Sequence, residues 1–202
     1  MGLTASDPGG NQDFDPINEG MHHAICIGLW DLGTHYMERF GKSAHKILLQ
    51  WEVPEERIEI DGKDLPRAIS KQYTLSLHQK ANLRKDLQSW RGKSFTDKEL
   101  EGFNLEKLLG VNCTLQVLHN KKDDKQYANV ISIVPLMKHM EKRKPENSIK
   151  FFSFSDHTNI PQGTPDWIAD IIKAADEWGE GKQNNEFPYD DVPPPDDDDI
   201  PF

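Results

Sequence analysis

No hydrophobic run in this 202-residue sequence approaches the roughly 20 apolar residues that a membrane-spanning helix needs. Apolar residues make up 36% of the chain and come in short groups, which suffices for one core of ordinary size. The first residues are small, polar and acidic, and they lack the basic and apolar stretches of a secretory signal. We therefore expect a cytoplasmic protein that does not enter a membrane.

Cysteine is scarce: Cys26 and Cys113 are far apart in the sequence, and neither belongs to a CxxC pair. Both lie in apolar, strand-like segments, where a thiol usually packs as a small hydrophobic side chain. This predicts two buried thiols in a reducing compartment rather than a metal or catalytic site.

The sequence also lacks a complete catalytic motif. Gly41-Lys42-Ser43 and Gly92-Lys93-Ser94 resemble the end of a phosphate-binding loop. That loop begins with a further glycine, but Tyr36 and Leu87 stand at the required positions. Residues 43–46 fit the S-x-x-K pattern, yet the downstream partners of that motif are missing. We expect no enzymatic activity, no cofactor and no bound metal.

The net charge of −10 comes from the two ends of the chain. Residues 1–20 carry four acids and residues 183–202 carry seven, and neither segment has a base. Of the 34 acidic residues, 23 are therefore left in residues 21–182, against all 24 basic residues. Acidic ends on a locally basic body are one charge pattern of nucleic-acid-binding proteins, although basic clusters are also common on ordinary solvated faces.

Several segments alternate apolar and polar residues with the period of a β-strand. The clearest is residues 44–53, in which Ile47, Leu49 and Trp51 share one side. Asp61-Gly62 is a strong hairpin signal after an extended stretch. Residues 57–60 continue this extended stretch into the hairpin. We expect a loop at residues 33–43 and further strands at residues 21–32, 68–77, 113–119 and 127–134.

Helical spacing replaces this alternation between the third and fourth strands. Leu83, Leu87 and Trp90 lie on one helical face, and Gly92 ends the helix. Five strands with a helix in that place is the layout of the oligonucleotide-binding (OB) fold, a small barrel. We therefore predict an all-β fold with added helices, built on a five-stranded OB-fold barrel in residues 21–135.

The remaining segments flank this barrel. Residues 1–20 are rich in Gly, Pro, Asn and Asp, which predicts a flexible N-terminal arm. Residues 136–182 are expected to form a connector and an amphipathic C-terminal helix with Ile168, Ile172 and Trp178 on its apolar stripe. That helix packs on the barrel or, alternatively, serves as a docking or dimer helix. Residues 183–202 are dominated by Pro and Asp, which predicts a disordered acidic tail.

The last seven residues carry the most specific signal. Their order closely resembles the C-terminal tip of bacterial single-stranded DNA-binding proteins, which implies binding of replication, recombination and repair proteins. Phe202 offers a ring and a free carboxylate to a partner's pocket, and the preceding acids suit a basic rim. The alternative is a generic acidic tail that only competes with DNA for the protein's own binding groove. The expected partner-binding residues are Asp196, Asp197, Asp198, Asp199, Ile200, Pro201 and Phe202.

The middle of the chain resembles phage or prophage-encoded OB-fold single-stranded DNA-binding proteins over about residues 20–135. The resemblance is one of pattern and is carried by residues 46–52, 73–77, 83–92 and 102–110. It implies a protein that coats single-stranded DNA in the cytoplasm of a bacterial host. It leaves room for a homodimer and makes the bacterial tetramer doubtful.

Binding of single strands without sequence preference needs aromatic rings for the bases and cations for the phosphates. On an OB barrel these belong to strands 2 and 3 and to loops 1-2 and 4-5. Trp51 shares the side of Ile47 and Leu49, which favours a core position over a stacking role. The candidate DNA-binding residues are Tyr36, Arg39, Phe40, Lys42, Lys46, Trp51, Lys71, Tyr73, Lys121, Lys122, Lys125 and Tyr127.

Two other functions remain open at this point. A recombination mediator or annealing protein would share the fold and promote strand pairing. A protein-only adaptor would not bind DNA, and its tail would capture host repair enzymes. The nearly neutral charge of residues 21–182 is compatible with this alternative.

Overall fold

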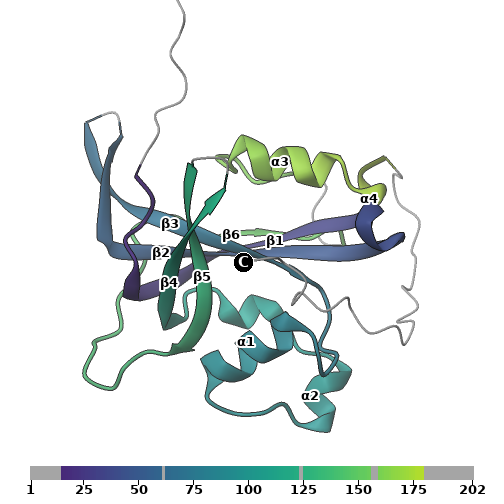
Figure 1. The fold of residues 1–202 in the computed structure, drawn as a ribbon, viewed down its shortest axis with the longest axis horizontal. Coiled ribbons are helices and arrows are strands. Elements are labelled where there is room, and N and C mark those ends of the chain that lie inside the picture. Colours follow the sequence, from purple (N-terminus) through teal and green to yellow (C-terminus); the bar gives the residue numbers. More distant parts are fainter. Residues whose placement is uncertain (1–14, 61, 123–124, 156–158, 180–202) are drawn as a thin grey trace, which may run out of the picture.

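The computed structural model describes residues 15–60, 62–122, 125–155 and 159–179 (Figure 1). Most of the expected arm and the whole expected tail lie outside these residues. In chain order the elements are β1 (Gly20–Met37), η1 (Glu38–Phe40), β2 (Lys42–Ile60), β3 (Lys63–Thr74), α1 (Asn82–Arg91), α2 (Asp97–Glu101), η2 (Leu105–Leu108), β4 (Asn112–Lys122), β5 (Lys125–Pro135), β6 (Lys150–Phe152), α3 (Asp166–Lys173) and α4 (Asp176–Gly179).

Five antiparallel strands curl into an open half-barrel in the order β3-β2-β1-β4-β5 (Figure 1). This confirms the five strands and the helix between the third and fourth. The N-terminal part of β1 pairs with β4 and its C-terminal part with β2, so β1 joins the two halves of the sheet. Within the described residues no hydrogen-bonded ladder joins β3 to β5, so the sheet does not close. The short β6 pairs in parallel with residues 28–30 of β1.

Residues 33–43, expected as a loop, mostly extend the β1–β2 hairpin. Pairing continues as far as Met37 with Lys42, and only η1 and Gly41 make the turn. Gly41 has a φ of 59°, a left-handed conformation that glycine adopts without strain. The expectation was wrong because this end of the hairpin projects beyond the core. Its residues therefore lack the apolar alternation that marks a half-buried strand.

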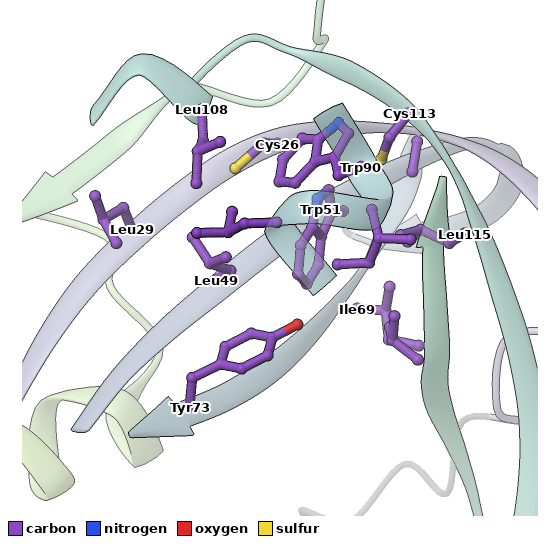
Figure 2. Packing of buried hydrophobic residues seen from close by; sticks show 14 of the residues in the cluster. Cys26, Leu29, Leu49, Trp51, Ile69, Tyr73, Trp90, Leu108, Cys113 and Leu115 are labelled. Atoms are coloured by element: carbon purple, nitrogen blue, oxygen red, sulfur yellow. The ribbon is translucent and has the colours of Figure 1, made fainter. Parts of the chain in front are cut away.

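The main core fills the concave side of the half-barrel, where alternate residues of β1, β2 and β4 meet α1 (Figure 2). Trp51 of β2 is fully buried, and its ring centroid lies 5.9 Å from that of Trp90 on α1. Cys26 and Cys113 are buried in the same cluster, as predicted. Burial raises the pKa of the Cys26 thiol to about 12, so it stays protonated and packs as an apolar group.

A second, smaller core lies under the C-terminal segment, on the other face of β1 and β2. The amphipathic helix thus packs on the sheet, but it is divided into α3 and α4. Trp178, expected on the apolar stripe, is 39% exposed near the end of α4, and its ring centroid lies 6.5 Å from that of Phe154. The buried residues of this second core are Trp30, Leu32, Leu48, Phe152, Ile168 and Ile172.

Residues 15–19, part of the expected flexible arm, are held against the sheet. Ile17 is buried in the main core, and its carbonyl oxygen is hydrogen-bonded to the ring of His119 on β4. Arg67 of β3 donates a hydrogen bond to the carbonyl oxygen of Asp15. This stretch therefore links β3 to β4, which the loop-like composition of residues 1–20 did not indicate.

Candidate nucleic-acid interface

A groove of about 390 Å³ lies on the outer face of β2 and β3, beside the C-terminal segment. Ile58, Leu65 and Pro66 form an apolar wall on the side of the β2–β3 hairpin. Gln50 of β2 and Asn147 of the connector supply amide groups. The segment that leads into α3 completes the lining with Gly163 and Pro165.

Two basic residues, Arg67 and Lys150, line this groove, and none of the lining residues within the described part of the chain is acidic. Arg67 pairs with the core residue Val53, so its side chain leaves β3 on the concave side, and Lys150 is the residue whose charge faces the groove. Arg67 is held by the carbonyl oxygen of Asp15, and the Lys150 ammonium donates to the carbonyl oxygen of Gly163. Burial lowers the pKa of Lys150, because the charged form loses part of its hydration there. An anionic ligand would give this ammonium a favourable partner, so the groove suits phosphate groups.

The β1–β2 hairpin carries the exposed aromatic rings that were expected in loop 1-2. Tyr36 is 63% exposed and Phe40 is 40% exposed. The Arg39 guanidinium lies 5.5 Å from the centroid of the Phe40 ring, and Lys42 begins the next strand. The structure thus brings four of the candidate residues together at one hairpin end. Rings beside cations offer both a stacking surface and phosphate partners.

The outer face of β3 leads from this hairpin to the groove. Lys46 pairs with Thr74 in the β2–β3 ladder, and its ammonium donates to the Thr74 hydroxyl at 2.7 Å. Further along β3, Gln72 and Ala68 are exposed. Leu48 of β2, by contrast, is covered by α3. An extended chain therefore has an open route along β3, beside the covered part of the sheet.

Three candidates from strands 2 and 3 do not face this surface. Trp51 and Tyr73 point into the main core and are buried (Figure 2), so neither ring offers a free face to a base. The Tyr73 hydroxyl donates to Asp86 at 2.7 Å, and the Lys71 ammonium pairs with the same carboxylate at 2.8 Å. Since strand alternation puts Lys71 on the side of Tyr73, its charge is neutralised on the concave face. The prediction of these three residues as DNA-binding residues is not supported.

The β4–β5 hairpin stands apart from the groove. Lys121 and Lys125 are exposed near its end, where Lys122 pairs with Lys125. Tyr127 pairs with Asn120 and lies on the outer face of β4 and β5, not on that of β2 and β3. The partner-binding residues Asp196 to Phe202 lie outside the described residues.

Sequence reasoning missed Lys150, Gln50 and Asn147. Gln50 could have been found, because it alternates with the inward residues Leu49 and Trp51. Lys150 could not, since its position depends on the pairing of β6 with β1, far away in the sequence.

A half-buried histidine cluster attaches α4 to the β1–β2 hairpin. The His45 ring lies 2.6 Å from a carboxylate oxygen of Asp31 and 3.5 Å from one of Glu177. Glu177 also accepts hydrogen bonds from the backbone and the hydroxyl of Thr34, each at 2.7 Å. Burial lowers the pKa of His45, but the hydrogen bond to Asp31 and the charges of Asp31 and Glu177 outweigh it, and the net effect raises the pKa.

This cluster predicts a pH-dependent contribution to stability. A histidine whose pKa is raised on folding stabilises the protein fully below its unfolded pKa, and the effect disappears as pH rises through the folded pKa. We expect wild type to melt above His45→Gln near pH 6, and the difference to shrink as pH rises above the ordinary histidine pKa and through the raised pKa of folded His45. Thermal melts followed by circular dichroism across this range test it. A difference that stays constant or grows with pH would contradict the charged state of His45.

The comparisons with known proteins do not assign the chain to a family. No protein-family model matches the sequence, and no curated protein matches it significantly. Among the described residues, no group of three or more His, Cys, Asp or Glu side chains is arranged to hold a metal ion. No helix in the described part of the chain is long and apolar enough to cross a membrane.

Proposed function

We propose that this protein is a non-enzymatic OB-fold protein that binds single-stranded DNA along the outer face of β2 and β3. The strand order, with α1 between β3 and β4, supports the OB-fold assignment. The observation that carries the functional proposal is the groove on that face, since OB-folds bind oligonucleotides across strands 2 and 3. The Lys150 ammonium and the lack of an acid among the described residues of the lining suit a polyanion.

In this proposal the interface divides into two parts. Tyr36 and Phe40 stack bases at the β1–β2 hairpin, where each stacked base is worth roughly 1–3 kcal/mol. Lys150 binds phosphate in the groove, and the amides of Gln50 and Asn147 hydrogen-bond bases or sugars. The remaining phosphate contacts come from Arg39, Lys42 and Lys46.

We further propose that the protein coats exposed strands during DNA replication, recombination or repair in a phage-infected bacterium. Its last seven residues would then recruit partner proteins, as the resemblance to the bacterial tip implies. The acids and the terminal Phe202 have the chemistry for this, because a basic pocket can clamp the carboxylate and bury the ring.

Titration of fluorescently labelled oligo-dT with the full chain tests the proposal. We expect saturable binding at low salt that weakens linearly in a plot of log affinity against log salt, because bound phosphates release counterions. Removal of residues 196–202 should leave this affinity equal or higher, since the truncation takes away four acids and no base. Lower affinity after truncation would contradict the separation of roles.

The two alternative functions predict different results in the same experiments. A protein-only adaptor would not bind oligo-dT at any salt concentration. An annealing protein would bind it and would also accelerate the pairing of complementary strands, which a coating protein does not.

A further inference from the structure

The outer face of β4 and β5, together with the start of β1, exposes four large apolar side chains. Met21, Leu118, Tyr127 and Ile131 are each between 42% and 49% exposed. The register puts Met21 opposite Gln116, Leu118 opposite Asn129 and Tyr127 opposite Asn120, so their side chains share one face of neighbouring strands. Ile131 is the extra residue at the β4–β5 bulge.

The inward residues of the same strands explain why these four are not part of the core. Leu115 and Val117 of β4 and Val130 and Ile133 of β5 are buried on the concave side. Because side chains alternate across a strand, their neighbours point outward. The core therefore does not use this second apolar set, and the C-terminal segment covers a different face, that of β1 and β2.

On β4 and β5 this face carries no charged side chain between Gln116 and Asn120 or between Tyr127 and Ser132; beside it, the Glu19 carboxylate ahead of β1 accepts a hydrogen bond from the backbone N–H of His119 at 2.7 Å. Its polar members are Gln116, Asn120, Asn129 and Ser132, all neutral. In a chain with 29% charged residues, such a stretch has the composition of a protein interface centre, where charged residues are depleted and aromatic residues and Met are enriched. The exposed Lys121 and Lys125 at the hairpin end give it a charged rim.

We infer that this neutral face of β4 and β5 binds the same face of a second copy of the chain, forming a twofold dimer. Two copies with a net charge of −10 each repel one another, so they can approach best where both surfaces are neutral. A twofold contact brings the same patch together with itself. The amides of Gln116, Asn120 and Asn129 carry both donors and acceptors and can therefore satisfy one another across the axis.

Nucleic acid is a poorer occupant of this face, because its centre has no cation to meet the phosphates. The groove on β2 and β3 has the Lys150 ammonium and lies on a different outer face of the curled sheet. A dimer through β4 and β5 would leave that groove open in both copies. The inference does not depend on the proposed function.

Sedimentation equilibrium of the full chain over a wide micromolar range tests the dimer. We expect wild type to have twice the mass of one chain, and Leu118→Lys and Ile131→Lys to have the mass of one chain with unchanged circular dichroism. Met21→Lys provides the same test from β1 if a change in β4 or β5 impairs folding. Trp167→Lys is the matched control, since Trp167 is equally exposed on α3, and it should remain a dimer.

Two results would overturn the inference. One is a wild-type protein that stays monomeric at every concentration. The other is a dimer that persists in folded Leu118→Lys, Ile131→Lys and Met21→Lys. If these variants keep the wild-type mass and instead no longer bind oligo-dT, the face belongs to nucleic acid and the dimer assignment is wrong.

Discussion

Replacement of Lys150 by Glu should lower the affinity for oligo-dT by about 10- to 100-fold, because it removes a charge-assisted hydrogen bond worth roughly 1.5–3 kcal/mol. Lys150 lines the groove on the outer face of β2 and β3, where its ammonium donates to the carbonyl oxygen of Gly163. The slope of log affinity against log salt should also fall by about 0.7 for each phosphate that the variant no longer neutralises. Fluorescence anisotropy of a labelled oligonucleotide at several salt concentrations measures both effects.

Lys98→Glu is the matched control for Lys150→Glu. Lys98 is an exposed lysine on α2, which lies below the half-barrel in Figure 1, away from the strands that form the groove. The same change of charge at that position should alter affinity little. Equal decreases in affinity from Lys98→Glu and Lys150→Glu would mean that net charge, not the groove, controls binding.

Replacement of Trp51 by Ala should lower the free energy of unfolding by about 3–5 kcal/mol, the range found when a large aromatic side chain is removed from a core. The Trp51 ring is fully buried and packs on Trp90 of α1 (Figure 2). Such a decrease is a large part of the roughly 5–15 kcal/mol that is typical of a whole domain. Urea denaturation followed by circular dichroism measures it.

Trp51→Phe separates the packing role from a role in DNA binding. It keeps most of the ring and removes an indole N–H that has no hydrogen-bond partner within the described residues. We expect it to cost far less stability than the alanine variant and to leave oligo-dT affinity unchanged. A stable Trp51→Ala protein with weakened DNA binding would instead restore Trp51 as a stacking residue.

The sequence predicted those elements whose side chains face the core. The alternation of Ile47, Leu49 and Trp51 marked β2, and Leu83 and Leu87 marked α1, because burial imposes the period of the element on the sequence. The same rule failed at residues 33–43. Most of this hairpin end extends beyond the core, so its sequence shows no alternation of apolar and polar residues that would indicate strands.

The candidate interface was predictable only in part, for a related reason. Tyr36 and Phe40 are close in sequence to a recognisable turn, and the structure exposes both. Tyr73 also looked suitable, but its hydroxyl reaches Asp86 on α1, a tertiary contact that no local pattern shows. Lys150 likewise reaches the groove only through long-range strand pairing. Residues that are positioned by contacts with distant parts of the sequence can be identified only in the folded structure.

Mapping of amide chemical shifts by NMR during an oligo-dT titration tests the central claim most directly. We predict that the shifts change most in three segments that border one outer face: residues 36–46, residues 66–74 and residues 147–150. Changes confined to the outer face of β4 and β5, or no changes at saturating oligonucleotide, would contradict the proposed path of single-stranded DNA.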